Sequence, residues 1–187
     1  KDRLYVSAPC DTRRRTCQTV LALIVEHLAG AIAPVLCHMA EDIWQNIPYK
    51  VKEESVFLRG WPIIPDSWRD LSLIAPMQNL RDLRVEVNRV LEDCRGKKEL
   101  GAALEASLRL DITNKSLEDS IAWLIREGDK EVDVLSDWLL VSYLQLGGEP
   151  WAELLASKET KLATIDVARA RGIKCERCWH YENDIGN

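Results

Sequence analysis

The chain has 187 residues, 47% hydrophobic and 29% charged, which is enough for one or two domains with hydrophobic cores and too apolar for a disordered chain. Its longest apolar run, Val20 to Val25, is far too short to span a bilayer, so we expect no membrane partner. The first residues contain no signal-peptide core, and a cytoplasmic, reducing location is expected, with the six cysteines as thiols or metal ligands.

The net charge of −5 is unevenly distributed along the chain. Residues 111–137 carry eight acidic and three basic side chains, so the rest of the chain sums to zero. Basic clusters lie outside this segment: Arg13, Arg14 and Arg15; Lys97 and Lys98; Arg169, Arg171, Lys174 and Arg177. Such clusters could form a phosphate-binding face, although any one of them alone is more typical of a solvated helix face.

The first hundred residues show helical periodicity. Apolar residues recur along one helical stripe from Cys17 to Ile32, along a second from Leu36 to Ile47, and along a third from Met77 to Cys94. Together with a short helix at 67–74, these stripes predict an antiparallel helical bundle over residues 1–104.

The hydrophobic period then changes. Apolar and polar residues alternate over 107–113, which predicts a strand with one buried face, and Asn114 or Ser116 can cap a short helix after it. A nearly continuous apolar run over 138–146 predicts a second strand, and alternation over 163–167 predicts a third. Residues 105–170 are therefore expected to form a small α+β subdomain.

The last segment, 171–187, contains a CxxC knuckle. Cys175 and Cys178 have the spacing with which two thiolates of one tight turn bind a single zinc ion. A structural zinc site needs four protein ligands, and only six residues follow Tyr181, although His180 could add an imidazole. We therefore expect a truncated zinc knuckle in a chain cut from a longer protein. A redox role is disfavoured because no thioredoxin-like βαβ context surrounds the motif.

Catalytic motifs are missing from the sequence. There is no glycine-rich phosphate loop and no GxSxG elbow, and His27 and His38 are more typical of core or surface packing than of a nucleophile's base. We expect no catalytic residues in this chain.

Several stretches resemble the C-terminal region of the bacterial and organellar isoleucyl-tRNA synthetases: Lys1–Tyr5, Arg14–Leu21, Leu28–Trp44, Lys97–Leu110 and Lys174–Tyr181. The resemblance implies a mainly α fold, with a bundle of the class I synthetase anticodon-binding type followed by the α+β subdomain and the knuckle. The nucleotide-binding fold with its ATP motifs, the editing domain and the second cysteine pair are absent from this sequence. The resemblance thus implies a parent that joins isoleucine to its tRNA with ATP, contains zinc in the full-length protein, and acts as a monomer.

A tRNA-binding role also fits the residues themselves, since single-stranded loops are bound by aromatic and arginine planes that stack on bases and by cations that hold phosphates. The candidate tRNA-binding residues are Arg3, Tyr5, Arg13, Arg14, Arg15, Lys97, Lys98, Lys174, Arg177, Trp179 and His180, and the candidate metal ligands are Cys175 and Cys178. Two other classes remain open: a zinc-knuckle DNA-binding module like that of base-excision glycosylases, and a non-catalytic protein-interaction bundle. We expect isoleucine tRNA, not DNA, as the partner.

Overall fold

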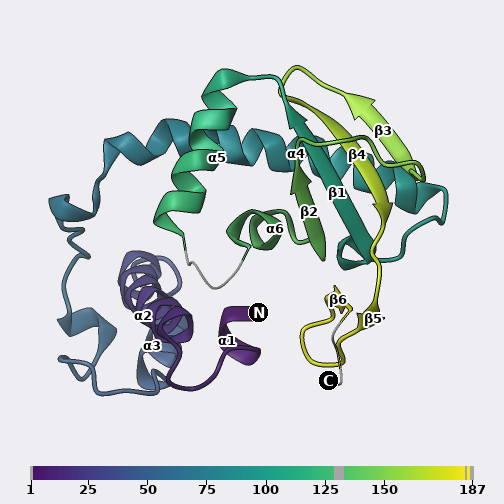
Figure 1. The fold of residues 1–187 in the computed structure, drawn as a ribbon. Coiled ribbons are helices and arrows are strands. Elements are labelled where there is room, and N and C mark those ends of the chain that lie inside the picture. Colours follow the sequence, from purple (N-terminus) through teal and green to yellow (C-terminus); the bar gives the residue numbers. More distant parts are fainter. Residues whose placement is uncertain (1, 129–132, 184, 186–187) are drawn as a thin grey trace. The chain divides into compact units, whose positions relative to one another are not determined.

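The computed structural model describes residues 2–128, 133–183 and 185, and about half of the chain is helical, with a small mixed sheet (Figure 1). The chain divides into two compact units, Lys1–Arg69 and Asp70–Asn187. Over the described ranges, no helix is long and apolar enough to cross a membrane.

The N-terminal unit is helical. Its elements are α1 (Asp2–Tyr5), α2 (Thr12–Ile32), α3 (Cys37–Gln45) and the short 3-10 turns η1 (Val56–Leu58) and η2 (Asp66–Trp68). Asp11 caps α2, because its carboxylate accepts a hydrogen bond of 2.7 Å from the backbone N–H of Arg13. The stretch predicted as a short helix at 67–74 consists of η2, the turn η3 (Leu71–Leu73) of the second unit, and the start of α4.

Two side chains of α3 fix the loop that follows it. The carboxylate of Glu41 accepts hydrogen bonds from Ser55 Oγ at 2.8 Å and from the backbone N–H of Val56 at 3.1 Å. The indole N–H of Trp44 donates to the carbonyl of Glu53 at 2.9 Å. The Trp44 ring is also buried, so these hydrogen bonds hold residues 53–56 against α3.

The apolar stripe predicted on α2 is largely exposed. Val20, Leu21, Ile24 and Leu28 have exposed fractions of 49%, 45%, 53% and 54%. The buried core of this unit is instead small and lies further along the chain, at Ala29, Ala33, Ala40, Trp44 and Val56. Hydrophobic periodicity predicted the helix correctly, and these four side chains of its apolar stripe are exposed.

The C-terminal unit is a four-stranded sheet with helices on one face. Its elements are α4 (Ile74–Gly96), η4 (Ala103–Glu105), β1 (Ala106–Ile112), α5 (Lys115–Glu127), α6 (Val134–Leu139), β2 (Tyr143–Leu146), β3 (Ala156–Glu159), β4 (Ala163–Arg169), β5 (Ile173–Lys174) and β6 (Tyr181–Glu182). The strand order is β2-β1-β4-β3; β1 pairs parallel with β2 and antiparallel with β4. Of the two predicted cap candidates, Asn114 caps α5, and its side chain accepts a hydrogen bond from Leu117 N–H at 3.0 Å, whereas Ser116 lies within the helix.

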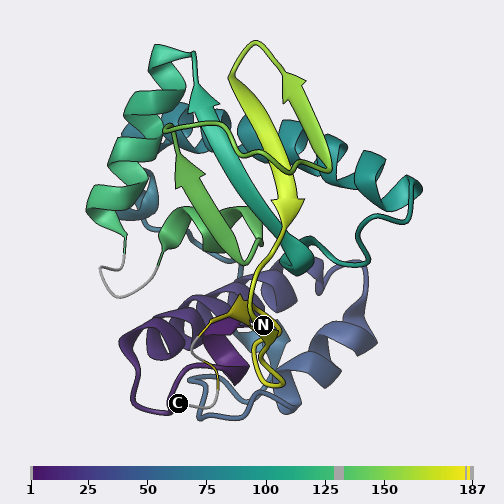
Figure 2. The same cartoon turned by 45° about the vertical axis from the view of Figure 1, so that its right-hand side comes forward.

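Helix α4 runs across the back of this sheet (Figures 1 and 2). Its buried residues, among them Leu83 and Val87, share one core with Leu108 and Leu110 of β1 and with Ile165 of β4. Burial on one face of α4 matches the predicted stripe. The boundary between the two compact units thus lies after residue 69, and α4 belongs to the same unit as the sheet. The sequence predicted a boundary at residue 104 instead, with a separate segment from residue 171. The hairpin at the end of the chain belongs to the same unit as the sheet.

The strand predicted over 138–146 is wrong in its first half. Asp133 caps α6, accepting from the N–H groups of Leu135 and Ser136, and Leu140 ends the helix in the left-handed conformation. Only Tyr143–Leu146 forms a strand. A short apolar run without clear periodicity does not distinguish a buried helix from a buried strand, and here the N-terminal cap decides the outcome.

Candidate nucleic-acid interface

The predicted tRNA-binding residues of the N-terminal unit lie on α1 and at the start of α2. Arg3 is exposed, and Tyr5 is 73% exposed. Arg13, Arg14 and Arg15 occupy the first turn of α2, and Arg14 Nη1 donates to the carbonyl of Ser7 at 3.4 Å. Cations at a helix N-terminus oppose the helix dipole. Helix stability therefore does not explain this basic turn, and an anionic ligand would.

Lys97 and Lys98 follow the last turn of α4. Lys98 adopts a left-handed conformation, with φ of 62°, and its N–H donates to the carbonyl of Arg95 at 2.9 Å. Cations at a helix C-terminus interact favourably with the dipole. A favourable interaction with the helix dipole is therefore enough to explain these two lysines. They are weaker evidence for a phosphate site than the arginines of α2.

The remaining candidates lie together on the hairpin β5–β6. The N–H of Cys175 donates to the carbonyl of His180 at 2.8 Å, and the N–H of Trp179 donates to the carbonyl of Cys175 at 2.9 Å. Trp179 is 49% exposed, and Lys174 Nζ lies 5.8 Å from its ring centroid. Exposed Arg177 and half-buried His180 belong to the same turn. The turn therefore presents an aromatic ring on which a base could stack, and cations beside the ring that could bind the adjoining phosphate.

Gly172 allows this hairpin to close. Its φ is +96°, and a Cβ there would lie 2.2 Å from the carbonyl oxygen of Glu182. The hairpin is also tied to the sheet, because the N–H of Tyr181 donates to Ser142 Oγ at 2.8 Å.

The two cysteines fit one half of a zinc site. Backbone N–H groups of Cys178 and Arg177 point at the sulfur of Cys175 and lower the pKa of that thiol, whereas burial raises the pKa of Cys178. Such N–H···S bonds would stabilise a metal-binding thiolate. Among the described residues, however, no group of three or more His, Cys, Asp or Glu side chains could hold a metal ion. The knuckle thus provides two of the four ligands that a structural zinc needs.

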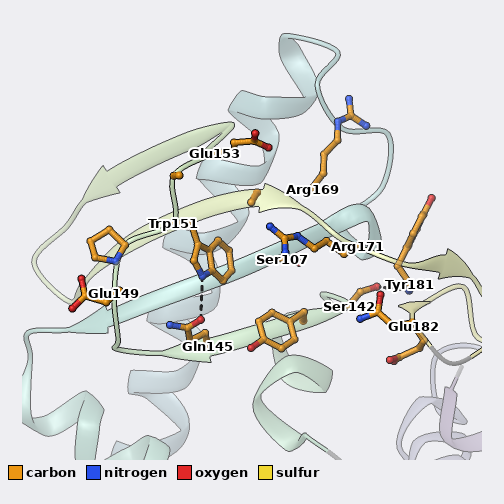
Figure 3. A pocket seen from close by; sticks show the side chains of 15 residues that line it. Ser107, Ser142, Gln145, Glu149, Trp151, Glu153, Arg169, Arg171, Tyr181 and Glu182 are labelled. Carbon is orange, nitrogen blue, oxygen red and sulfur yellow. Dashed lines mark hydrogen bonds between the residues drawn. The ribbon is translucent and has the colours of Figure 1, made fainter.

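A pocket of about 860 Å³ opens on the face of the sheet opposite α4 (Figure 3). The loop 147–155 crosses this face from β2 to β3 (Figures 1 and 2) and carries Trp151. The pocket lies between that loop and the segment from β4 to β6, with Ser107 in its floor. The sequence indicated Arg169 and Arg171 only as members of a basic cluster, and Trp151 was missed. The Gly147-Gly148 pair, both at positive φ, was the available signal for a chain reversal there.

The structure thus defines a helical unit with a basic helix start, and a sheet unit that carries a cation-and-aromatic hairpin and an open pocket. These features are typical of an RNA-binding protein built from two units.

Comparison with known proteins agrees with that class. Residues 1–110 match the family model described as the anticodon-binding domain of tRNA ligase. The chain therefore belongs to the family of tRNA ligase anticodon-binding domains.

Similar proteins are named isoleucine–tRNA ligases. The chain is 68% identical over 186 residues to such proteins from Prochlorococcus marinus (strain MIT 9313), Parasynechococcus marenigrum (strain WH8102) and Synechococcus sp. (strain CC9311). Each match covers 100% of this chain and 19% of the relative.

Proposed function

We propose that this chain is the anticodon-recognising, tRNA-binding part of an isoleucine–tRNA ligase, a cytoplasmic enzyme that joins isoleucine to its tRNA with ATP. The observation that carries the proposal is the family match over residues 1–110 together with relatives of that name at 68% identity. ATP and isoleucine would bind to parts of the protein outside this chain, so the chain alone is expected to be catalytically inactive. We also expect the protein to be a monomer.

The residues that we assign to tRNA are the eleven candidates, and two groups among them have the best structural support. The arginines of α2 form a cationic helix start that helix stability does not explain. The hairpin β5–β6 places Trp179 beside Lys174 in a turn held by backbone hydrogen bonds. The first group is suited to phosphates, and the second is suited to a base with its adjoining phosphate.

Zinc in the full-length protein is part of the proposal. Cys175 and Cys178 would supply two thiolates, and donors from outside the described residues would complete the tetrahedron. The metal would hold the knuckle rigid, and with it Trp179 and Arg177. The proposal also assigns the helices of residues 1–104 to an anticodon-binding bundle of the class I synthetase type.

The test is a fluorescence anisotropy titration of end-labelled isoleucine tRNA with the 187-residue chain, from about 50 to 200 mM salt. We expect binding that weakens steeply with salt, because each phosphate contact displaces counterions. A non-cognate tRNA and a DNA duplex of equal charge serve as competitors. Equal or better competition by the duplex would favour a DNA-binding module, and no binding to any nucleic acid would favour a protein-interaction unit.

A further inference from the structure

The pocket on the open face of the sheet is built around a fixed tryptophan. The indole N–H of Trp151 donates to Gln145 Oε1 at 3.0 Å (Figure 3). Gln145 Nε2 donates in turn to the carbonyl of Gly147 at 2.9 Å. The ring of Tyr143, itself 53% exposed, lies 6.2 Å from that of Trp151 at an interplanar angle of 33°. The indole polar group is thus satisfied within the protein, and the surface left for a ligand is aromatic.

The loop that carries Trp151 is anchored at several points. The N–H of Gly147 donates to the carbonyl of Leu110, and the N–H of Leu155 donates to the carbonyl of Val167, both at 2.8 Å. Between these ends, the carbonyl of Gly148 accepts from Arg109 Nη1 at 3.2 Å. The position of Trp151 therefore depends on the sheet beneath it, so a ligand would meet a preformed surface and lose less ordering entropy on binding.

The charged groups around the pocket favour a base over a phosphate group. Arg169 and Arg171 bring two guanidinium groups, and Figure 3 shows Arg171 directed toward Trp151. Glu149, Glu153 and Glu182 bring three carboxylates, one more than the guanidinium groups. A free nucleoside triphosphate would meet this excess of negative charge. Carboxylates do, however, accept hydrogen bonds from the exocyclic amino groups of bases.

Cations for the backbone of a bound strand lie next to the pocket. Tyr181 and Glu182 of the pocket wall pair in the β5–β6 ladder with Lys174 and Ile173. Lys174 lies against the ring of Trp179. A strand that leaves the pocket along this hairpin would pass from stacking on Trp151 to a second aromatic ring with a cation beside it.

We propose that this pocket binds one unpaired base of the tRNA, stacked on Trp151 and covered by the Arg171 guanidinium, with a preference for bases that carry an amino group. Apart from Ser107, the residues that line the site lie beyond the family match, and the site adds Trp151, Tyr143, Arg169 and Arg171 to the proposed tRNA-binding surface. The inference rests on the proposed tRNA-binding function.

The first experiment compares W151F and W151L in tRNA anisotropy titrations at fixed salt. Phenylalanine keeps an aromatic face, whereas leucine keeps only apolar volume, so we expect W151F to bind within about twofold of the unchanged chain and W151L about tenfold more weakly, as for loss of one base–aromatic stack. R171Q should weaken binding severalfold. R89Q is the matched control, since Arg89 is an exposed arginine on α4 paired with Glu86. W151L affinity equal to that of the unchanged chain would overturn the inference.

The second experiment measures binding on the unchanged chain, and W151F serves only to assign one signal. Cytidine and uridine 5′-monophosphates are titrated into the unchanged chain, and the indole ¹H–¹⁵N signal of Trp151, assigned by its loss in W151F, is followed by NMR. We expect this signal to move with the cytidine nucleotide and less with the uridine one. An unmoved signal, while tRNA still binds in a salt-dependent way, overturns the pocket and leaves the proposed function standing. Absence of tRNA binding by the unchanged chain overturns the proposed function and, with it, this inference.

Discussion

Arg109 of β1 and Asp166 of β4 are direct partners in the antiparallel register, with Nη2 and Oδ2 2.7 Å apart on the open face of the sheet. Both side chains are nearly inaccessible, with exposed fractions of 6% and 3%. Ser157 Oγ donates a hydrogen bond to the other carboxylate oxygen of Asp166 at 2.6 Å, and Arg109 Nη1 donates one to the carbonyl of Gly148. One buried pair thus connects three strands to the loop that carries Trp151.

Removing one member of this pair should be costly. D166L leaves the Arg109 guanidinium buried and uncompensated, and we expect a loss of about 3–5 kcal/mol in the free energy of unfolding, measured with urea. The double variant R109M/D166L should recover most of that loss, because two apolar side chains leave no buried charge. E118Q, which breaks an exposed pair with Lys115, should change stability by less than about 1 kcal/mol. A D166L effect as small as that of E118Q would contradict this account.

The hydrogen bonds to Glu41 should make the N-terminal unit sensitive to acid. Donation from Gln45, followed by donation from Ser55, lowers the pKa of this carboxyl below its ordinary value of 4.5. A carboxyl with a lowered pKa stabilises the fold above its unfolded pKa and loses that contribution as the pH falls through its folded pKa. The free energy of unfolding of the unchanged chain should therefore exceed that of E41Q by the largest amount near neutral pH, and this difference should disappear in acid. Urea titrations across this range would show it, and a difference independent of pH would contradict it.

Residues 70–187 should fold without the first unit, because α4 and the sheet share one core. The circular dichroism and cooperative thermal unfolding of this piece should resemble those of the same unit in the whole chain. A chain that ends at Lys98 should fail to keep α4 folded, since Leu83 and Val87 would lose Leu108 and Leu110 as partners. A cooperative unfolding transition of α4 in that shorter chain would show that the helix has a core of its own.

Charge reversal at the start of α2 should weaken tRNA binding without changing its selectivity. R14E/R15E should lower the affinity for cognate and non-cognate tRNAs alike and reduce the slope of log affinity against log salt by about one for each phosphate that the variant no longer binds. R81E/R89E, which reverses two exposed arginines of α4, is the control with an equal change of charge. An unchanged slope in R14E/R15E would show that the arginines of α2 do not bind phosphates.

Zinc should bind this chain weakly. Cys175 and Cys178 offer two thiolates, and a stable structural site requires four ligands held by the fold. Metal analysis after dialysis against a chelator should find far less than one zinc per chain, and C175S/C178S should not alter thermal stability. One zinc per chain retained against the chelator would show that a closed site exists within these residues.

The sequence predicted local features of the fold better than the way they pack. The two cap candidates Asn114 and Ser116 and the alternation over 107–113 were sufficient to locate α5 and β1, because caps and strand faces depend on a few adjacent residues. The run over 138–146 lacks a period and contains both a helix and a strand. The exposure of Val20 and Leu28 was not predictable, since an apolar stripe identifies one face of a helix and does not say what packs against that face.

The candidate site shows the same division between local and distant information. The hairpin with Cys175 and Trp179 was recognisable because its residues are consecutive. The pocket joins β1, the loop 147–155 and the segment from β4 to β6, which only the register of the sheet brings together. No local motif indicates such a site.

Helix α4 lies within the family match, which ends at residue 110, yet it is packed into the sheet that continues to residue 169. A chimera that joins the anticodon-binding module of one ligase to the rest of another at residue 110 would cut within β1, and it would set α4 and most of β1 against β2 and β4 of a different protein. Such a chimera should fold only when the junction is moved to residue 69, or when α4 and the entire sheet come from the same ligase.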